Sequence, residues 1–529
     1  MFSQSDSFAL EFDDVTFRYQ NADRPSLKNV SLKVPYGQCI VITGRSGCGK
    51  TTLTRLVNAL IPVVYEGDLQ GEVRVLGTQI PSWTMGTLSA HVGSVFQNPR
   101  SQFVNLDVTS EIAFGCESLG IAREEMVARV EQAAAALDIS HLLGRSIEAL
   151  SGGQKQAVIL SSVYAVHPDI FVLDEPTASL DVGAMQQLAQ TVALLKSQGK
   201  TVFVSEHRLW WLAGIADRYV MLENGCIKGD WTADEFAKLP LEQRNAWGLR
   251  AASLAEIDAL VTLYVPDNAN KAIPPSSGES PVVCMRDVVA GYRTTPMVLN
   301  NLDFSLVPGH VVGIVGRNGA GKTTLVRCMA GLLKEKAGSI EVESVRLSAK
   351  KRAGRVYLVM QEPGYQLFSS TVDDELADAS RALREQGSVV DEAEVAQVKE
   401  ALGLEELAVR HPLSLSGGER QRLSIAAGLL SHARAMVLDE PTSGLDYRNM
   451  QRIGEQVARM RNAGIGVCIV SHDYEFLCSV CDEIALVEGG CIKERFALTK
   501  ATLPRLKQNF GFAEMQQQEK GSKWKANQR

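Results

Sequence analysis

The sequence lacks the long apolar runs of a protein that crosses a membrane. Hydrophobic residues make up 45% of the 529 residues. They never form the uninterrupted run of about 18 that a spanning helix requires. We therefore expect no membrane-spanning segment. Met1 to Asp6 contain neither a basic start nor an apolar core, so no secretory signal is expected there.

A basic surplus is also missing. Lys and Arg number 54 against 61 Asp and Glu, which gives a net charge of −7. Proteins that hold nucleic acid mainly by its phosphates carry a basic excess, so nucleic acid is not an expected partner. The 10 cysteines are scattered over a long chain, which is typical of a reducing compartment and not of a disulfide framework.

What the sequence does contain is one long pattern that occurs twice. Its landmarks keep their order, and the offset from Lys50 to Lys322 is nearly the same as that from Asp174 to Asp439. A repeat of this length indicates a duplicated domain and not a solenoid. The repeated segments are Gly44–Thr51 with Gly316–Thr323, Leu150–Gln154 with Leu415–Glu419, and Val172–Thr177 with Val437–Thr442.

The repeat predicts two domains, at 1–245 and 281–510. Between them, 246–280 contains Pro274-Pro275-Ser276-Ser277-Gly278, a composition typical of a linker. The last residues, 511–529, form a polar tail without periodicity, which we expect to lie outside the second domain.

Short apolar runs precede the polar motifs in both halves. Cys39–Thr43 and Val311–Val315 lead into glycine-rich loops, and Ile170–Leu173 and Ala435–Leu438 end in acid pairs. Continuous apolar strands belong in a parallel sheet that helices cover on both faces. Helical spacing at 124–143 and 392–407 supplies such helices, so the sequence predicts an α/β fold.

Both glycine-rich loops fit G-x-x-x-x-G-K-[ST]. The glycines let successive backbone N–H groups cradle phosphate oxygens, and the following helix adds its positive end. We expect Lys50 and Lys322 to contact the outer phosphates and Thr51 and Thr323 to ligate Mg²⁺. The candidate ATP-binding residues are Gly44, Arg45, Ser46, Gly47, Cys48, Gly49, Lys50, Thr51 and Thr52 in the first loop and Gly316, Arg317, Asn318, Gly319, Ala320, Gly321, Lys322, Thr323 and Thr324 in the second.

The acid pairs at the strand ends supply the predicted chemistry. Asp174 and Asp439 are candidate Mg²⁺ ligands, while Glu175 and Glu440 are candidate general bases or water-orienting groups. The alternative is an ordinary surface acid pair, although a Pro-Thr dipeptide follows both.

One histidine follows each glutamate. His207 and His472 follow Glu175 and Glu440 at an identical spacing, each behind an apolar strand. We expect them to contact the γ-phosphate and to steady the transition state. A core or surface histidine is the alternative, but equal spacing in two copies favours the functional interpretation.

A glutamine and a tyrosine complete each predicted pocket. Gln97 and Gln361 begin Gln-Asn-Pro and Gln-Glu-Pro turns and could ligate Mg²⁺ from a loop that moves. Tyr19 and Tyr292, which precede the glycine-rich loops at nearly equal spacing, could stack on adenine; a packing role is the alternative.

The Ser-Gly-Gly segments open helix-like runs. Exposed amides at a helix start bind anions, but the glycine-rich loop already has that role in its own domain. A second phosphate-binding helix end therefore suits the nucleotide of the other domain. The residues are Ser151, Gly152, Gly153 and Gln154, and Ser416, Gly417, Gly418 and Glu419.

Together these motifs resemble the ATP-binding-cassette superfamily over nearly the whole chain. The resemblance implies two tandem P-loop domains, each with a parallel-sheet core, a small antiparallel β subdomain and a helical subdomain. It also implies that cassettes pair head to tail, so that Lys50 shares an ATP with Ser416 and Lys322 shares one with Ser151. Pairing within one chain and pairing between two copies both remain open.

A narrower resemblance is to the cassettes of energy-coupling factor importers. It rests on 96–104, 361–368, 107–115 and the turn at 205–208. It implies an ATPase at the cytoplasmic face of the membrane that drives uptake of a vitamin or metal ion. Its partners would be integral membrane subunits, one a transmembrane coupling component and one a substrate-capture component. Arg100 and Gly364-Tyr365 depart from that pattern in the segment where coupling helices dock.

Two alternatives belong to other classes. A tandem cassette ATPase that acts on the ribosome or on nucleic acid usually has a long charged connector, whereas this connector is short and contains Pro-Pro-Ser-Ser. Tandem ATPases of sugar importers usually have a degraded second half, whereas both halves here keep their Lys, Glu and His.

Overall fold

A computed structural model describes residues 8–20, 22–178, 180–266, 280–293, 295, 297–384 and 392–512. The chain divides into two compact units, Met1–Glu256 with Asp446–Arg448 and Ile257–Leu445 with Asn449–Arg529. The Pro-Pro-Ser-Ser segment, the polar tail beyond Phe512 and the side chain of Arg100 lie outside the described part. The predicted domain limits at 245, 281 and 510 remain predictions, and the expected connector includes a helix, α10 (Leu254–Tyr264).

The first unit contains a six-stranded sheet in the order β10-β9-β3-β8-β7-β6. Strands β9, β3, β8, β7 and β6 are parallel, and β10 joins β9 as an antiparallel edge. Every residue of β3, β7 and β8 is buried, which is why these strands are continuously apolar. The strands of this unit are β1 (Phe8–Tyr19), β2 (Leu27–Pro35), β3 (Cys39–Gly44), β4 (Gly67–Val75), β5 (Thr78–Gln79), β6 (Val92–Val95), β7 (Ile170–Asp174), β8 (Thr201–Ser205), β9 (Arg218–Glu223) and β10 (Cys226–Thr232).

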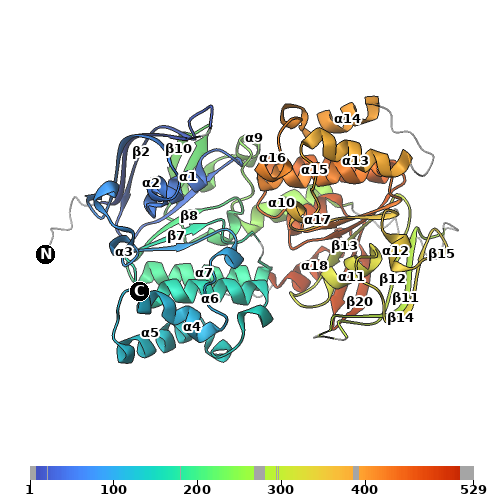
Figure 1. Cartoon of the computed structure of the whole chain (residues 1–529), viewed down its shortest axis with the longest axis horizontal. Coiled ribbons are helices and arrows are strands. Elements are labelled where there is room, and N and C mark those ends of the chain that lie inside the picture. The colour runs from blue at the N-terminus through green and yellow to red at the C-terminus, as the bar shows by residue number, and fades with distance from the viewer. Residues whose placement is uncertain are drawn as a thin grey trace. The chain divides into compact units, whose positions relative to one another are not determined.

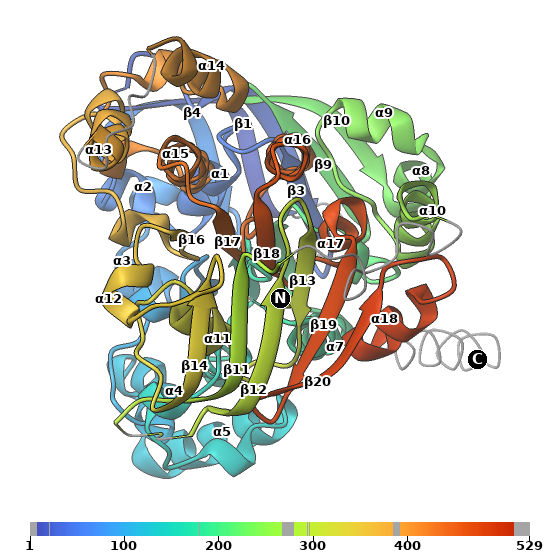
Figure 2. The same ribbon diagram turned by 90° about the vertical axis from the view of Figure 1, so that its right-hand side faces the viewer.

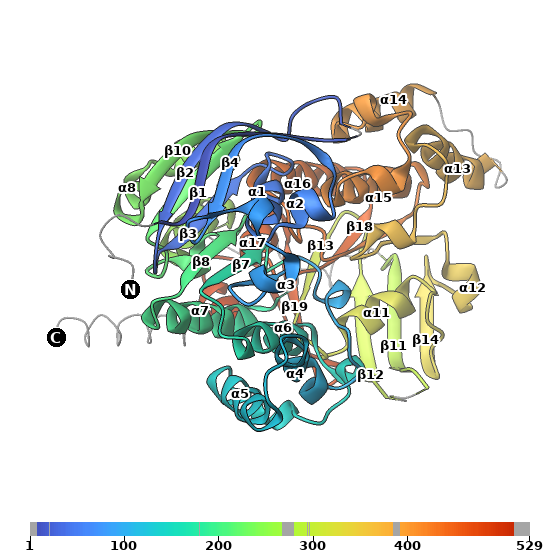
Figure 3. The same cartoon turned by 60° about the vertical axis from the view of Figure 1, so that its left-hand side comes forward.

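An antiparallel sheet, β2-β1-β4-β5, packs over one face of the parallel core. Helix α1 lies between the two sheets, because its Leu53, Leu56 and Val57 share one apolar cluster with Ile40 of β3 and Phe12 of β1. Figures 1 and 3 show α6 and α7 on the opposite face of the parallel sheet. The helices are α1 (Lys50–Val57), α2 (Leu60–Val63), α3 (Met85–Leu88), α4 (Val108–Ser118), α5 (Arg123–Ala136), α6 (Gly152–Ala165), α7 (Val182–Ser197), α8 (Ala233–Lys238) and α9 (Leu241–Ala246).

The second unit repeats this plan. Its sheets run β16-β17-β18-β13-β19-β20 and β12-β11-β14-β15, and α13 and α14 pack beside α15 as α4 and α5 pack beside α6 (Figures 1 and 2). The strands are β11 (Val283–Ala290), β12 (Leu299–Leu306), β13 (Val311–Val315), β14 (Ala337–Val342), β15 (Val345–Arg346), β16 (Val356–Val359), β17 (Ala435–Asp439), β18 (Gly466–Val470), β19 (Glu483–Glu488) and β20 (Cys491–Ala497). The helices are α11 (Lys322–Met329), α12 (Ala349–Arg352), α13 (Val372–Arg384), α14 (Glu392–Leu402), α15 (Gly417–Leu430), α16 (Tyr447–Asn462), α17 (Tyr474–Val480) and α18 (Leu503–Phe510).

The predicted α/β class and the three parts of each unit are confirmed. Two predicted helices end earlier than their spacing indicated, α5 at Ala136 and α14 at Leu402. Asp138 and Gly403 adopt positive φ angles of 56° and 60° just beyond, and a left-handed residue stops a helix. Within the described residues, no helix has the length and apolar character needed to cross a bilayer.

Candidate functional site

The two glycine-rich loops connect β3 to α1 and β13 to α11. Gly44 and Gly316 have φ angles of 138° and 152°. A Cβ atom at either glycine would lie 2.2 or 2.3 Å from the carbonyl oxygen of Leu222 or Val487, so only glycine fits where the loop leaves the sheet. Glycine-rich turns of this kind can direct successive backbone amides toward one anion.

Lys50 is buried inside the first loop, with 4% of its surface exposed. Its Nζ donates to the carbonyl oxygens of Gly44 and Arg45, both at 3.3 Å, and lies 3.1 Å from His207 Nε2. Glu175 Oε1 lies 3.8 Å from the same Nζ. The structure therefore brings together the predicted phosphate-binding lysine, histidine and glutamate of this unit.

The acid pair lies where the backbone leaves its strand in a left-handed conformation. Asp174 ends β7, and Glu175 follows with φ at +45°; Glu440 after β17 has φ at +51°. In a continuing strand, adjacent side chains would point to opposite faces. The left-handed conformation instead lets Asp174 lie near the Thr51 hydroxyl, 3.4 Å away, while Glu175 faces His207 Nε2 at 3.2 Å.

The electrostatics of Glu175 follow from its neighbours. Burial raises the pKa of its carboxyl group, but the charges and hydrogen bonds of His207 and Lys50 oppose that effect and leave the pKa below its usual range. Gln97 Nε2 also donates to Glu175 Oε2 at 2.7 Å. A carboxylate held ionised beside donors suits a group that orients water.

The second unit brings its residues together differently. Lys322 Nζ donates to the carbonyl oxygens of Gly316 at 2.7 Å and Arg317 at 3.1 Å. His472 Nε2 lies 3.6 Å from Glu440 Oε1 and 3.1 Å from Asn318 Oδ1. The histidine of this unit therefore faces its glycine-rich loop as well as its glutamate.

Asp439 has a strongly perturbed carboxyl group. Burial raises its pKa to about 6, although Lys322, Arg327 and a hydrogen bond from Thr323 act in the opposite direction. Burial likewise raises the pKa of Asp174, where the Ser205 hydroxyl opposes the change. Both aspartates therefore carry a cost of desolvation that a bound cation would relieve.

Asp439→Asn is expected to stabilise the chain at pH 7.5 by roughly 2–3 kcal/mol in the absence of nucleotide and divalent ions. The folded chain holds the Asp439 proton up to pH about 6, whereas an unfolded aspartate releases it near pH ~4. Wild-type stability therefore falls as pH rises between these values, and asparagine removes that loss. Chemical denaturation from pH 4 to 7.5 measures it, with exposed Asp23→Asn as control. If the difference in unfolding free energy between Asp439→Asn and wild type did not change with pH, the raised pKa of Asp439 would be contradicted.

The surroundings of the two glutamines differ between the units. Gln97 donates directly to Glu175, as described above. Glu440 Oε2 is approached instead by the Ser471 hydroxyl and the His472 amide, at 3.4 and 3.2 Å, although Gln97 and Gln361 are both exposed. The structure thus joins Gln97 to its predicted site, while the part of Gln361 in a cation site stays a prediction.

The tyrosines lie at the start of α1 and α11. The Tyr19 hydroxyl lies 3.2 Å from Thr52 Oγ1, and Arg55 donates to it at 3.0 Å. Tyr292 occupies the same position beside Thr324 and is 37% exposed. Both rings therefore border the glycine-rich loop, and their hydroxyl groups give Thr52 and Thr324 an anchoring role that the sequence did not indicate. Stacking on adenine stays a prediction.

Each Ser-Gly-Gly segment begins a long helix with a capping box. Ser151 Oγ accepts from the Gln154 amide at 3.3 Å, and Gln154 Oε1 accepts from the Ser151 amide at 2.9 Å. Ser416 and Glu419 make the same pair at 3.3 and 2.7 Å. Glu419 can take the place of Gln154 because the capping box needs only a side-chain oxygen that reaches the serine amide. Gly152 and Gly153, like Gly417 and Gly418, form the first helical turn.

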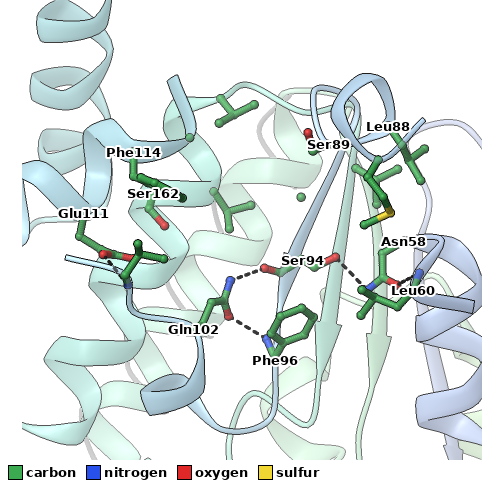
Figure 4. Close-up of a pocket in the computed structure, with 17 residues that line it drawn as sticks. Asn58, Leu60, Leu88, Ser89, Ser94, Phe96, Gln102, Glu111, Phe114 and Ser162 are labelled. Carbon is green, nitrogen blue, oxygen red and sulfur yellow. Dashed lines mark hydrogen bonds between the residues drawn. The ribbon is translucent and has the colours of Figure 1, made fainter. Parts of the chain in front are cut away.

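Sequence reasoning missed two sets of hydrogen bonds, here called braces, that hold the loops of Gln97 and Gln361: one made by Gln102 and Glu111, the other by Gln366 and Glu375. Gln102 accepts from the Phe96 amide at 3.1 Å and donates to Ser94 O at 2.7 Å (Figure 4). Gln366 bonds the same backbone positions of its own unit. Glu111 and Glu375 then cap the loop that follows through two backbone amides each. The signal was present, because both braces recur at the same spacing after Gln97 and after Gln361.

The donor set fits Mg²⁺ bound together with a nucleotide. Thr51 with Asp174 and Thr323 with Asp439 each offer a hydroxyl and a carboxylate, the hard oxygen ligands that Mg²⁺ prefers. In the described part of the chain, no group of three or more His, Cys, Asp or Glu side chains is arranged to hold a metal. A cation here would therefore take its remaining ligands from phosphate and water.

The glycine-rich loops, acid pairs and histidines on two parallel-sheet cores define a protein with two P-loop ATP-binding units. The ABC transporter family profile matches residues 27–178 and 299–443. A relative from Treponema denticola, named “Putative ABC transporter ATP-binding protein”, is 40% identical over 90% of this chain and 95% of its own. The chain belongs to the ABC transporter family and is one of its ATP-hydrolysing, ATP-binding proteins.

A second relative aligns with most of this chain, and a solved structure aligns with about half of it. “Putative HMP/thiamine import ATP-binding protein YkoD” of Bacillus subtilis is 30% identical over 90% of this chain and 89% of its own. The solved structure of cbiO1 from Clostridium perfringens, described as part of the ABC transporter complex cbiONQ, covers 48% of this chain and 99% of its own, with 23% identity and a TM-score of 0.42.

Proposed function

We propose that this chain is the ATPase of an importer of the energy-coupling factor type and that it drives uptake of a vitamin or a metal ion. The observation that carries the proposal is an open groove lined in part by Phe96, Gln102 and Val104. These residues belong to the loop of Gln97, and the Gln97 side chain donates to Glu175. The Bacillus relative, whose name states thiamine import, supports the choice of an importer. The site of action would be the cytoplasmic face of the membrane.

The chemistry assigned to the chain follows from the contacts of its two units. The loop amides with Lys50 or Lys322 bind the phosphates of ATP. Mg²⁺, held by Thr51, Gln97 and Asp174 or by Thr323, Gln361 and Asp439, neutralises phosphate charge when it is bound. Glu175 or Glu440 orients the attacking water, and His207 or His472 stabilises the charge on the γ-phosphate.

Each ATP is further proposed to contact the Ser-Gly-Gly segment of the other unit, Ser416 for Lys50 and Ser151 for Lys322. In the first unit, α6 begins at Gly152 on the sheet face opposite to α1 (Figures 1 and 3). The amides that start α6 therefore belong to a helix on the other face of the sheet from α1. A second ATP-binding surface, on another unit of this chain or of a second copy, gives them a ligand.

The groove for the membrane partner lies in the first unit beside the braced loop. It has a volume of about 290 Å³ and is bordered by α3, β6, α4 and α6. Figure 4 shows Leu88, Phe96 and Phe114 around the groove, with Gln102 inside the loop and bonded to Phe96 and Ser94. Val104 on its rim is 62% exposed. In the second unit, Tyr365 and Phe368 are exposed on the corresponding loop, by 68% and 85%.

Tagged chain expressed with its neighbouring genes is expected to co-purify with integral membrane proteins from detergent-solubilised membranes. Val104→Asp should reduce that recovery by about fivefold or more, because a charge on the rim prevents apolar docking, while ATP binding stays unchanged. Val345→Asp, on β15 and 53% exposed, is the matched control.

Two outcomes count against the proposal. The chain could stay alone under these conditions, or it could sediment with ribosomes in an ATP-dependent way. The second outcome would favour a tandem ATPase outside transport.

A further inference from the structure

The two histidines are held by different acids. When the units are aligned on His207 and His472, Glu206 corresponds to Ser471 and Arg208 corresponds to Asp473. The acid therefore precedes the histidine in the first unit and follows it in the second. The local sequences are Ser205-Glu206-His207-Arg208 and Val470-Ser471-His472-Asp473.

In the second unit, Asp473 performs two structural tasks. Its Oδ2 accepts the hydroxyl proton of Thr442 at 2.9 Å, and its Oδ1 accepts from the Phe476 amide at 3.3 Å at the start of α17. The amide of His472 donates elsewhere, to Glu440 Oε2 at 3.2 Å. The backbone of this histidine is therefore tied to the candidate base itself.

In the first unit, Glu206 is 2% exposed and gathers four donors. Its Oε1 accepts from the Thr177 hydroxyl and from Trp211 Nε1, the latter at 3.3 Å. Its Oε2 accepts from the amides of His207 at 2.7 Å and Arg208 at 3.3 Å. Glu206 thus accepts from Thr177 as Asp473 accepts from Thr442. It also accepts from the His207 amide, whereas the His472 amide donates to Glu440.

The consequence is visible at Glu175. With the amide of His207 bound to Glu206, Glu175 is contacted by side chains, Gln97 Nε2 at 2.7 Å, His207 Nε2 at 3.2 Å and Lys50 Nζ at 3.8 Å. In the second unit the imidazole lies farther from its glutamate, at 3.6 Å, and faces Asn318. The buried acid and the close approach of imidazole to base occur in the same unit.

We propose that Glu206 is a positioning residue for His207, and that it directs the His207 imidazole toward Glu175 and Lys50 by holding the His207 amide. It touches neither nucleotide nor water in this role and acts only through the histidine. The inference rests on the proposed role of His207. It predicts that ATP hydrolysis in the first unit depends on a buried acid that the second unit does not have at that position.

Glu206→Leu removes both carboxylate oxygens from a side chain of similar size, so the amides of His207 and Arg208 lose their acceptor. The Thr177 and Trp211 groups lose theirs as well, and a graft of the second unit's sequence separates that loss from the loss at the amides. The test uses full-length chain that also carries Glu440→Gln, so that turnover with ATP and Mg²⁺ reports the first unit. In this background the change at Glu206 is expected to lower kcat roughly tenfold, while KM for ATP changes less than about twofold. Adding Glu206→Leu to His207→Ala should cause no further loss.

Transferring the second unit's sequence into the first distinguishes the positioning of His207 from a general role of Glu206 in core packing. Glu206→Ser with Arg208→Asp gives the first unit the Ser-His-Asp order of the second, which keeps an acid for Thr177 but removes the one on the His207 amide. The graft should keep the melting temperature within a few degrees and still lose roughly tenfold in kcat. Wild-type kcat in the graft, or losses that multiply in the His207→Ala background, would overturn the proposal.

A second readout does not require turnover. Hydrogen exchange of the His207 and Arg208 amides in nucleotide-free chain should be at least about tenfold faster in Glu206→Leu than in wild type. The Glu206 amide, which donates to the Ile42 carbonyl oxygen, and the 471–473 amides should stay unchanged. Exchange at His207 and Arg208 that equals the wild-type rate would also overturn the proposal. If wild-type chain failed to hydrolyse ATP, the proposed function would fail. Intact hydrolysis that is insensitive to Glu206 removes this inference alone.

Discussion

Replacing both Glu175 and Glu440 by glutamine is expected to lower ATP hydrolysis by about 100- to 10,000-fold while ATP still binds. Glutamine keeps the size of the side chain but cannot be ionised, so it cannot draw a proton from the attacking water. The structure makes the loss direct, because the Glu175 carboxylate faces His207 and Lys50 with a lowered pKa. The phosphate-binding loop is untouched, so affinity for ATP is retained.

Phosphate release and ATP binding, measured on the same preparation, test this prediction. The double variant should hold ATP and release it slowly, which is the behaviour of a trapped closed state. Each single change should depress turnover less than the double one. Glu488→Gln, at a side chain that is 60% exposed, is the surface control. Full hydrolysis in the double variant would refute the assignment of Glu175 and Glu440 as general bases.

Lys50→Ala and Lys322→Ala should act one step earlier and weaken ATP binding itself, by about 10- to 100-fold at each site. In the chain without nucleotide, each ammonium group is satisfied by two loop carbonyl oxygens. These contacts hold it at the centre of the loop, where phosphate oxygens can replace them. Alanine removes from the loop the one side-chain cation that contacts the phosphates and leaves the loop's backbone amides.

Titration calorimetry with ATP and Mg²⁺ measures this loss, with Lys33→Ala as a control at an exposed lysine on β2. Thermal melting is needed beside it, because removing Lys50 takes a cation away from the buried Glu175 carboxylate. A lysine variant that binds ATP as tightly as wild type while losing turnover would show that the lysine acts on the transition state alone.

Much of the site was predictable from local patterns. Gly44 and Gly316 occupy backbone positions that other residues cannot adopt, and β7 and β17 are apolar because both faces of the sheet are covered. Such constraints act on single residues or on short runs, so spacing in the sequence reports them. The duplication strengthened each prediction, because chance motifs do not recur in the same order.

The differences between the two units were not predictable in this way. Both glutamines begin similar turns, yet Glu175 accepts from Gln97 whereas Glu440 accepts from Ser471 and the His472 amide. Glu419 in place of Gln154 suggested asymmetry, but both close the same capping box. Which donor a buried acid finds depends on side chains that arrive from distant parts of the chain.

The sequence alone therefore determined the fold class, the two nucleotide-binding loops and the residue types that can hold and cleave a phosphate, since these follow from backbone sterics and strand burial. Only the tertiary structure decided how each histidine is held, because Thr177, Glu206 and Trp211 meet across a turn, a strand end and a short helix. A hydrogen bond forms where a buried donor finds its nearest acceptor, and that distance is a property of the folded chain.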